Sequence, residues 1–425
     1  MKNISMKNTF TLALRGLSRN RRRSMVTLLA IAFGYSAIVL FAGYTHNVYG
    51  GLARQSIYGE MLGHLTLSKR GMRKEGKLDP ERYMLTSTEV ASITKLLKDE
   101  KHIELLAPRL GLSGLISNGR ASTIFIADGI EPKAVVDLRQ GGLTDQERKS
   151  GMYENMKMRL DPEHSEVVSL SEGLVEMLHL SVGGQAVVLA NTLTGQANAL
   201  DITLGRSFNT GNAGSNDKFA FVSLALARSL LDAEGRADRL TILLDDVNRT
   251  ETMRAHLQEK LRAAGFDVEI QNWQDLSDFY NQVHGMFDMI FGFIFSIVLT
   301  VVIMSVANSM GMTVVERTRE IGTLRAIGLK RGGVIKLFTT ESMLLTLIGC
   351  ITGLLIALVV RWGINIAHIS YTPPNSASAV PLLIDLDARR AMFTFVLMGV
   401  VGTLAAYMPA RRAAKKDIID ALGHV

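Results

Sequence analysis

The hydrophobic residues of this chain gather in four long runs, and the polar stretches between the runs differ greatly in length. The runs that lack Lys, Arg, Asp and Glu cover residues 25–44, 289–312, 342–360 and 392–408. At the rise of an α-helix, about 20 apolar residues cross a hydrocarbon core of roughly 30 Å. The pattern therefore predicts transmembrane helices at 25–44, 286–312, 337–360 and 392–408.

The long stretch 45–285 contains no such run and is expected to form one large domain outside the bilayer. Its first part alternates like a strand at 62–68, turns helical from Ser87 to about residue 99, and is extended again at 103–117. A second strand, helix and strand follow at 240–244, 249–264 and 266–270. Two such units predict a split α+β domain, with an inserted β-rich lobe at about 131–238.

Apolar residues recur every three or four positions from this domain into the second run. They are Trp273, Leu276, Tyr280, Val283, Phe287, Ile290, Ile294, Ile297, Val301 and Met304. A helix that is continuous across the boundary would place this stripe on one face. We therefore expect a stalk that packs along the stripe and can transmit displacement.

Basic residues mark the orientation of the chain in the membrane. The segments 1–24, 313–336 and 409–425 carry seventeen Lys and Arg against four Asp and Glu. Because cationic flanks stay on the cytoplasmic side, both termini and 313–336 are expected inside, with 45–285 and the loop 361–391 outside. This segregation accounts for the pI near 9.4 without nucleic acid as a partner. A cleaved signal peptide is the alternative interpretation of the first run.

No catalytic or cofactor motif stands out in the sequence. A P-loop, an HExxH pair, an EF-hand loop and a GxSxG elbow are all missing, so no metal, no cofactor and no enzymatic activity are expected. Cys350 is the only cysteine, which excludes an intrachain disulfide. Glu341 lies in an apolar run, where it either hydrogen-bonds near the interface or takes part in a proton relay. Gly349 and Gly353 form a close-packing pair, within the chain or between protomers.

The charged segment at 316–332, ERTREIGTLRAIGLKRG, lies between the second and third runs. Ile321, Leu324 and Ile327 repeat every three residues and predict a short amphipathic helix at the membrane surface. Gly322 weakens this helix, and Gly328 suits its C-terminal cap. Such a helix can be held by a soluble partner.

Several stretches resemble one known family. The runs NSMGMTVVERTREIGTLRAIG (308–328) and PARRAAKKDIIDAL (409–422), with the segment after Glu341, are similar to permease subunits of FtsX/MacB-type ABC transporters. The resemblance implies four transmembrane helices and an extracytoplasmic α+β domain of the MacB periplasmic core type. It also implies that 313–336 holds a coupling helix that docks on an ATPase. The matching positions are Glu316, Arg319, Glu320, Ile321, Gly322, Leu324, Ala326 and Gly328.

The same resemblance implies the partners and the location. A separate cytoplasmic ABC ATPase dimer would bind ATP and Mg, a second permease protomer would complete the complex, and membrane lipid would surround it in the bacterial inner membrane. A periplasmic adaptor or lipoprotein chaperone is a further candidate partner. Lipoprotein release is favoured over export of an amphiphilic substrate. An FtsX-like regulatory module that activates or senses a periplasmic partner is the alternative, and a secondary carrier driven by Glu341 is a third.

Overall fold

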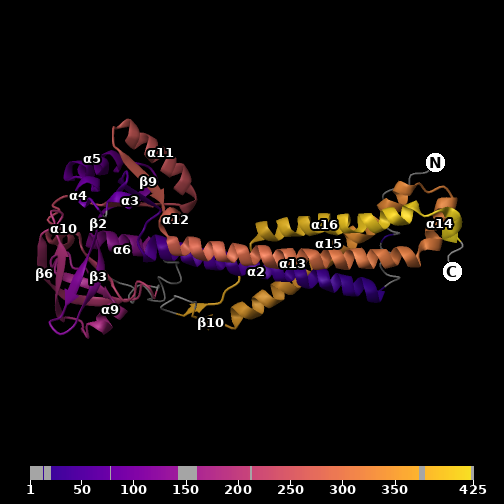
Figure 1. The fold of residues 1–425 in the computed structure, drawn as a ribbon, viewed down its shortest axis with the longest axis horizontal. Coiled ribbons are helices and arrows are strands. Elements are labelled where there is room, and N and C mark those ends of the chain that lie inside the picture. Colours follow the sequence, from indigo (N-terminus) through magenta and orange to yellow (C-terminus); the bar gives the residue numbers. More distant parts are fainter. Residues whose placement is uncertain are drawn as a thin grey trace. The chain divides into compact units, whose positions relative to one another are not determined.

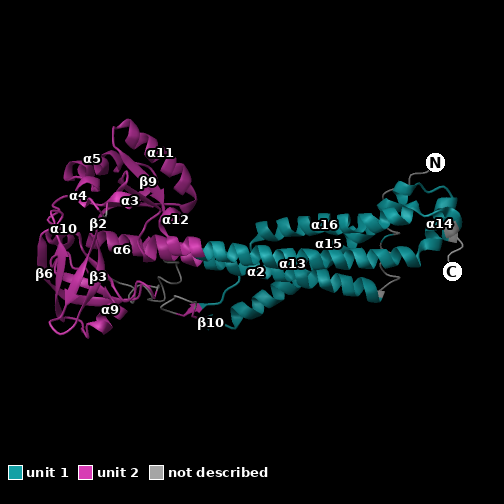
Figure 2. Cartoon of the chain, in the orientation of Figure 1, with its two compact units in different colours: residues 1–49, 283–370, 381–425 teal, residues 50–282, 371–380 magenta. Residues whose placement is uncertain are grey.

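The computed structural model describes residue 13 and residues 21–76, 78–141, 160–210, 213–372 and 379–422. Most of the predicted N-terminal segment 1–24 and part of the inserted lobe lie outside these residues. The chain divides into two compact units (Figure 2). We name residues 1–49, 283–370 and 381–425 the helical unit, and residues 50–282 and 371–380 the sheet unit.

Four helices within the described residues are long and apolar enough to cross a membrane (Figure 1). They are α2 (Arg21–Arg54), α13 (Asp278–Glu316), α15 (Arg331–Ile366) and α16 (Ala388–Lys415). At 1.5 Å per residue each is about 40 to 60 Å long, so each exceeds the predicted span. The shorter elements that lie between or after these helices are α14 (Thr318–Ala326), β10 (Ser370–Tyr371), β11 (Val380–Pro381) and α17 (Ile418–Leu422).

The helical unit has one buried core to which all four long helices contribute. Its members include Ile31 of α2, Val306 of α13, Phe338 of α15 and Met398 of α16. Cys350 lies in the same core as a free, buried thiol. The four helices therefore form a bundle through side chains of the same chain.

Both glycines of the predicted close-packing pair lie against α2. A Cβ on Gly349 would come within 2.8 Å of Ile31 Cγ2, and one on Gly353 within 2.4 Å of the Ala32 carbonyl oxygen. Both distances are below any normal Cβ contact, so α15 and α2 approach closely only because these residues are glycine. Between the two partners left open by the sequence, the structure places this contact inside the chain.

Only the first part of the predicted apolar stripe packs within the chain, where Tyr280 contacts Trp273 and Phe287 contacts Phe41 and Tyr49. Trp273 and Leu276 belong to a separate helix, α12 (Trp273–Leu276), and Ser277 separates it from α13. Ile297, Val301 and Met304 are exposed, while Val302 and Val306 are buried. For this later part the prediction was wrong, because α13 is apolar on all sides there and periodicity alone could not select the packing face.

Within its described residues, the sheet unit contains a sheet of nine strands in the order β3-β7-β4-β6-β5-β2-β8-β1-β9. Their bounds are β1 (Leu65–Lys69), β2 (Ile103–Ser117), β3 (Ser122–Ile130), β4 (Val167–Ser171), β5 (Gln185–Asn191), β6 (Ala197–Phe208), β7 (Phe219–Ser223), β8 (Arg239–Leu244) and β9 (Val268–Asn272). The helical elements among the described residues of this unit are η1 (Gln55–Gly59), α3 (Met72–Glu75), α4 (Pro80–Tyr83), α5 (Ser87–Leu97), α6 (Pro132–Gly141), α9 (Glu172–Met177), α10 (Leu224–Leu231), η2 (Val247–Arg249), α11 (Thr250–Ala263) and α12.

Four of these strands form the predicted split α+β arrangement. The units β1-α5-β2 and β8-α11-β9 interleave in the antiparallel order β2-β8-β1-β9, which is the ferredoxin-like pattern. Leu97 of α5 and Leu257 of α11 share one buried cluster with Leu67 of β1. Gly265 ends α11 with a positive φ of 84°. The fold class expected from the sequence, four long apolar helices plus an α+β domain, is therefore confirmed.

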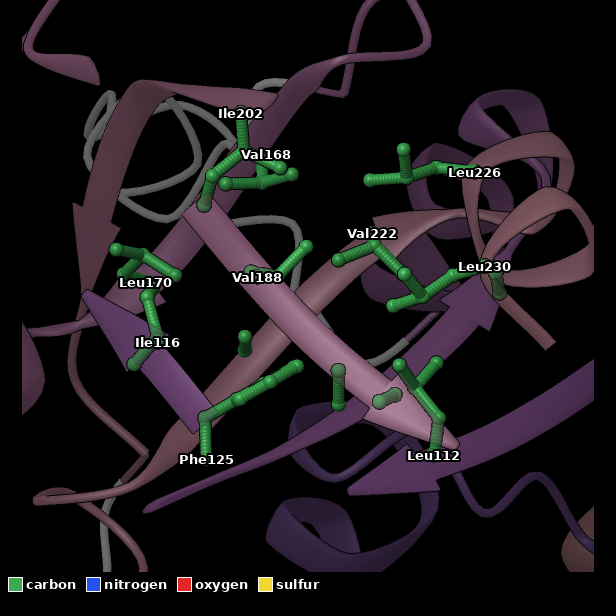
Figure 3. Packing of buried hydrophobic residues seen from close by; sticks show 14 of the residues in the cluster. Leu112, Ile116, Phe125, Val168, Leu170, Val188, Ile202, Val222, Leu226 and Leu230 are labelled. Carbon is green, nitrogen blue, oxygen red and sulfur yellow. The ribbon is translucent and has the colours of Figure 1, made fainter. Parts of the chain in front are cut away.

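The other strands close on themselves, which the sequence did not predict. Because β2 pairs with β3 along one edge and with β5 along the other, the strands β3-β7-β4-β6-β5-β2 form a ring. Figure 3 shows Ile116, Phe125 and Val188 packed together inside this ring with other aliphatic side chains. The predicted β-rich lobe is thus joined to the α+β part through the long strand β2, which belongs to both.

A buried charged cluster lies where β2, β3 and β8 meet. The Arg109 side chain is fully buried, and its guanidinium donates to Asp128, with Nε at 3.2 Å from Oδ1, and to the carbonyl of Met61. Arg239 joins Asp128 to Asp238, with 2.7 Å from Nη1 to Asp238 Oδ2. Burial raises the pKa of Asp238. The cluster links the shared strand β2 to the backbone that follows η1.

His64 makes the stability of the sheet unit sensitive to acid. The ring is 1% exposed, and its Nδ1 accepts the backbone N–H of Leu244 at 2.9 Å, so the neutral form is required. Burial lowers the pKa of His64 from 6.5 to about 4. The unfolded chain therefore takes up a proton at a pH where the folded chain does not, and stability is lost as the pH falls below about 6.5.

We expect the low pKa of His64 to decrease the free energy of unfolding by about 2.5 kcal/mol when the pH falls from 7 to 4.5. The free energy of unfolding is to be measured at both pH values for the wild type, His64→Asn and His179→Asn. Asparagine keeps an acceptor but does not titrate, so His64→Asn should show a shallower dependence on pH. His179 is exposed with a positive φ of 47°, which asparagine accepts, and its variant should match the wild type. Equal slopes in all three would contradict the assignment.

Candidate coupling site

The charged segment forms a short helix between two bends. α13 ends at Glu316, Arg317 leaves helical geometry with φ −103° and ψ 13°, and α14 runs over Thr318–Ala326. At the other end, the Gly328 N–H donates to Arg325 at 3.0 Å, the Leu329 N–H donates to Leu324 at 3.0 Å, and Gly328 has a φ of 105°. These two bonds and the left-handed glycine are a Schellman cap. Gly328 thus ends the helix as predicted.

Arg317 is the centre of the charged contacts at the first bend. Its Nε lies 2.9 Å from Glu320 Oε2 in α14, and its Nη1 lies 3.1 Å from Glu341 Oε2 in α15. The guanidinium also stands over the Phe338 ring, 5.7 Å from its centroid. The Glu341 side chain is only 3% exposed. The intramembrane carboxylate that the sequence singled out therefore has a cationic partner.

A second ion pair joins the ends of two long helices. Arg23 of α2 lies 3.0 Å from Glu316 of α13, measured from Nη1 to Oε1. Both side chains are about a third exposed, so the pair contributes at most a fraction of a kcal/mol. The main effect of this ion pair is to hold the start of α2 next to the bend at which α14 begins.

The inner face of α14 packs on the C-terminal part of the chain. Thr318, Ile321 and Arg325 line one shallow hollow with Ala413 of α16, Ala421 of α17 and Lys416 between them. Arg325 Nη1 also donates to the carbonyl of Lys416. α14 is thus held from behind by α16 and α17, which leaves its opposite face open.

The predicted contact residues of this segment fall into two groups. Ile321 and Gly322 are buried against the chain, and Glu320 and Leu324 are half-buried. The exposed members of the set are Glu316, Arg319, Ala326 and Gly328. Sequence reasoning left out Thr323 and Ile327 as contact residues, although both are exposed, and Ile327 is 81% exposed.

Arg317 was also missed as the partner of Glu341. The signal was available, because a carboxylate in an apolar helix requires a cation at matching depth. Arg317 is the bend residue itself, and α14 separates it in sequence from the third long helix, α15. The repeat of Ile321, Leu324 and Ile327 predicted the helix, but it gave no indication of a role for Arg317, which precedes the helix.

Part of the chain matches a known family model. Residues 292–418, which include α14, α15 and α16, match the family model FtsX-like permease C-terminal. The chain carries an FtsX-like permease domain and is homologous to ABC transporter permeases.

Individual relatives extend the match along the chain. The ABC transporter permease YtrF of Bacillus subtilis is 22% identical over 436 residues, covering 96% of this chain and 97% of its own length. The pyoverdine export ATP-binding/permease protein PvdT of Pseudomonas putida is 25% identical over 414 residues, covering 95% of this chain and 57% of PvdT. The macrolide export ATP-binding/permease protein MacB 1 of Yersinia pestis is 24% identical over 429 residues, 98% of this chain and 60% of MacB 1.

The chain thus spans little more than half of the two relatives whose names include an ATP-binding part. Among solved structures, the periplasmic region of MacB from Actinobacillus actinomycetemcomitans aligns with 50% of this chain and 89% of its own, with 16% identity and a TM-score of 0.33.

Proposed function

We propose that this chain is the permease of an ABC transporter in which a cytoplasmic ATPase drives an export step. The observation that carries the proposal is α14, a capped helix with a supported inner face and an exposed outer face inside the FtsX-like domain. A helix of this kind is suited to receive force from a soluble partner. The Lys and Arg distribution supports placing α14 in the cytoplasm and the sheet unit outside.

In the proposed mechanism, ATP binding and hydrolysis displace α14. The long helices α13 and α2 then carry the displacement through the membrane to the sheet unit. Two dimers are proposed, one of the ATPase and one of the permease. The nucleotide and its Mg²⁺ belong to the ATPase, and no residue of this chain is assigned to them.

The cargo is proposed to be amphiphilic. The relatives PvdT and MacB 1 are named for the export of pyoverdine and macrolides, which favours export over lipoprotein release. The sheet unit would act on the cargo outside the membrane, so no pore through the helical unit is required.

The exposed residues of α14 allow a direct test of the proposed docking. Arg319 and Ile327 are both exposed on and just after α14, whereas Glu320 is held by Arg317 and Leu324 is half-buried. The double variant Arg319→Glu/Ile327→Glu should therefore disturb docking without disturbing the bundle. We expect the ATP hydrolysis of the complex purified from its native membrane to fall about tenfold or more, as for interface hot spots.

The matched control is Arg389→Glu, a charge reversal at an exposed position near the opposite end of the helical unit, in α16. It should leave both ATP hydrolysis and the recovery of folded permease unchanged. If the double variant retains full ATP hydrolysis at normal recovery, α14 is not the docking element and the proposal fails.

A further inference from the structure

The bend between α13 and α14 is a single residue with non-helical geometry. Arg317 separates the last residue of α13 from the first residue of α14. Two backbone hydrogen bonds still cross it, from the Arg317 N–H to Thr313 at 3.1 Å and from the Ile321 N–H to Arg317 at 3.0 Å, but its non-helical φ and ψ make it the point at which the chain changes direction. Left without side-chain support, α14 could swing under load while α13 stayed still, and the displacement would be lost at the bend.

The side chain of the same residue ties three helices together. Arg317 extends from the end of α13, contacts Glu320 in the first turn of α14, and contacts Glu341 in α15. The Arg317 side chain is 19% exposed and that of Glu341 is 3% exposed, so water screens their contact weakly. The planar guanidinium suits this position because it donates in two directions at once.

The contact continues into the fourth long helix. Ser342, the neighbour of Glu341 in α15, is fully buried and donates from Oγ to the Gly402 carbonyl in α16 at 2.8 Å. A Cβ on Gly402 would come within 2.2 Å of Thr346 Oγ1, which shows how closely α15 and α16 approach there. Movement of Glu341 is therefore shared by α15 and α16.

We propose that Arg317 is a positioning residue that locks the bend, so that α14, α13 and α15 move together when the ATPase acts. This inference rests on the proposed function and adds the residue through which the displacement passes. Through Glu341 the Arg317 side chain is connected to α15, and through Glu320 it is connected to α14. The role is one of transmission and is separate from docking, which uses the exposed face of α14.

Transmission can be measured apart from docking. Cys350 is the only cysteine and is buried, so cysteines introduced at exposed sites can be labelled selectively. Donor and acceptor dyes at Lys98→Cys in the sheet unit and Arg389→Cys in the helical unit report movement between the units through energy transfer. The test uses the complex with its ATPase in lipid nanodiscs, with and without ATP.

In Arg317→Glu and in Glu341→Arg we expect the ATPase to remain bound and active. The ATP-dependent change in energy transfer should fall about fivefold or more. A decrease of this size corresponds to loss of a typical coupling between two distant sites. The exchanged pair Arg317→Glu/Glu341→Arg should restore at least half of the change. Arg317→Lys should give an intermediate value, since lysine carries the charge but lacks the planar guanidinium that donates to both Glu320 and Glu341. This variant tests the proposal if the charge-reversal variants do not fold. Lys336→Gln, at an exposed cation of α15, is the matched control.

Three results would overturn the role of Arg317. One is an unchanged energy-transfer response in the single variants, and another is failure of the exchanged pair to recover. The third is loss of the bound ATPase in Arg317→Lys, which would assign Arg317 to docking and leave the proposed function intact. By contrast, a wild-type complex that shows no ATP-dependent change would refute the proposed function itself.

Discussion

Replacing Gly353 by leucine is expected to prevent the helical unit from assembling. The first atom of the new side chain would stand 2.4 Å from the Ala32 carbonyl oxygen, which is backbone and cannot rotate away. α2 would have to leave α15, although Ile31 and Cys350 share one buried core. Overpacking of this kind costs about 1–3 kcal/mol where side chains can adjust, and more where backbone blocks the change.

Gly363 provides the matched control for this substitution. It lies on the same helix, and a Cβ at this position meets no atom within 4 Å. Gly363→Leu should therefore elute as a single species in size-exclusion chromatography, whereas Gly353→Leu should aggregate or be lost from the membrane. Gly353→Ala should fall between the two. Similar behaviour of both leucine variants would show that the contact between α2 and α15 is absent in the membrane.

Sequence analysis predicted well the features that depend on local patterns of residues. The four long helices follow from uninterrupted apolar runs, and the strand at 103–117 has the bounds of β2. The cap at Gly328 was predictable because only glycine readily adopts a φ of 105°. In each case the signal and the structure involve residues close together in the sequence.

The features that it missed depend on which distant residues meet. Closure of the strand ring requires β2 to pair with both β3 and β5, and neither pairing has a local signature. The predicted packing face of α13 included Ile297 and Val301, which are exposed. The sequence could not show this, because lipid-facing and protein-facing residues of a membrane helix are equally apolar. The contact between Arg317 and Glu341 spans the α14 segment. The carboxylate in an apolar run indicated a cationic partner, but the bend that brings Arg317 to Glu341 has no local signature.

The charged cluster of the sheet unit belongs to the same group of unpredicted long-range contacts, and it leads to the second large effect. Arg109 donates to Asp128 and to the carbonyl of Met61 while being fully buried. Arg109→Ala would leave Asp128 with Arg239 alone and would leave the Met61 carbonyl without this donor. Breaking one side of a buried ion pair costs about 3–5 kcal/mol, so we expect the sheet unit to lose that much stability.

Trp273 reports this loss directly. It is buried in the sheet unit, and the other tryptophan, Trp362, is exposed in the helical unit and can be replaced by phenylalanine. Denaturant unfolding followed by Trp273 fluorescence should show the decrease for Arg109→Ala. Arg120→Ala, at an exposed arginine in the turn after β2, should stay within about 0.5 kcal/mol of the wild type.

The double variant Arg109→Met/Asp128→Leu separates the cost of a broken pair from the value of the pair itself. Replacing both partners by apolar residues removes the uncompensated charge, so most of the lost stability should return. The cluster joins β2, the strand shared by the ring and the α+β part, to the backbone that follows η1. If Arg109→Ala proves no worse than Arg120→Ala, the cluster does not hold these parts together, and the rigidity needed for the proposed force transmission would have to come from the apolar cores of the sheet unit.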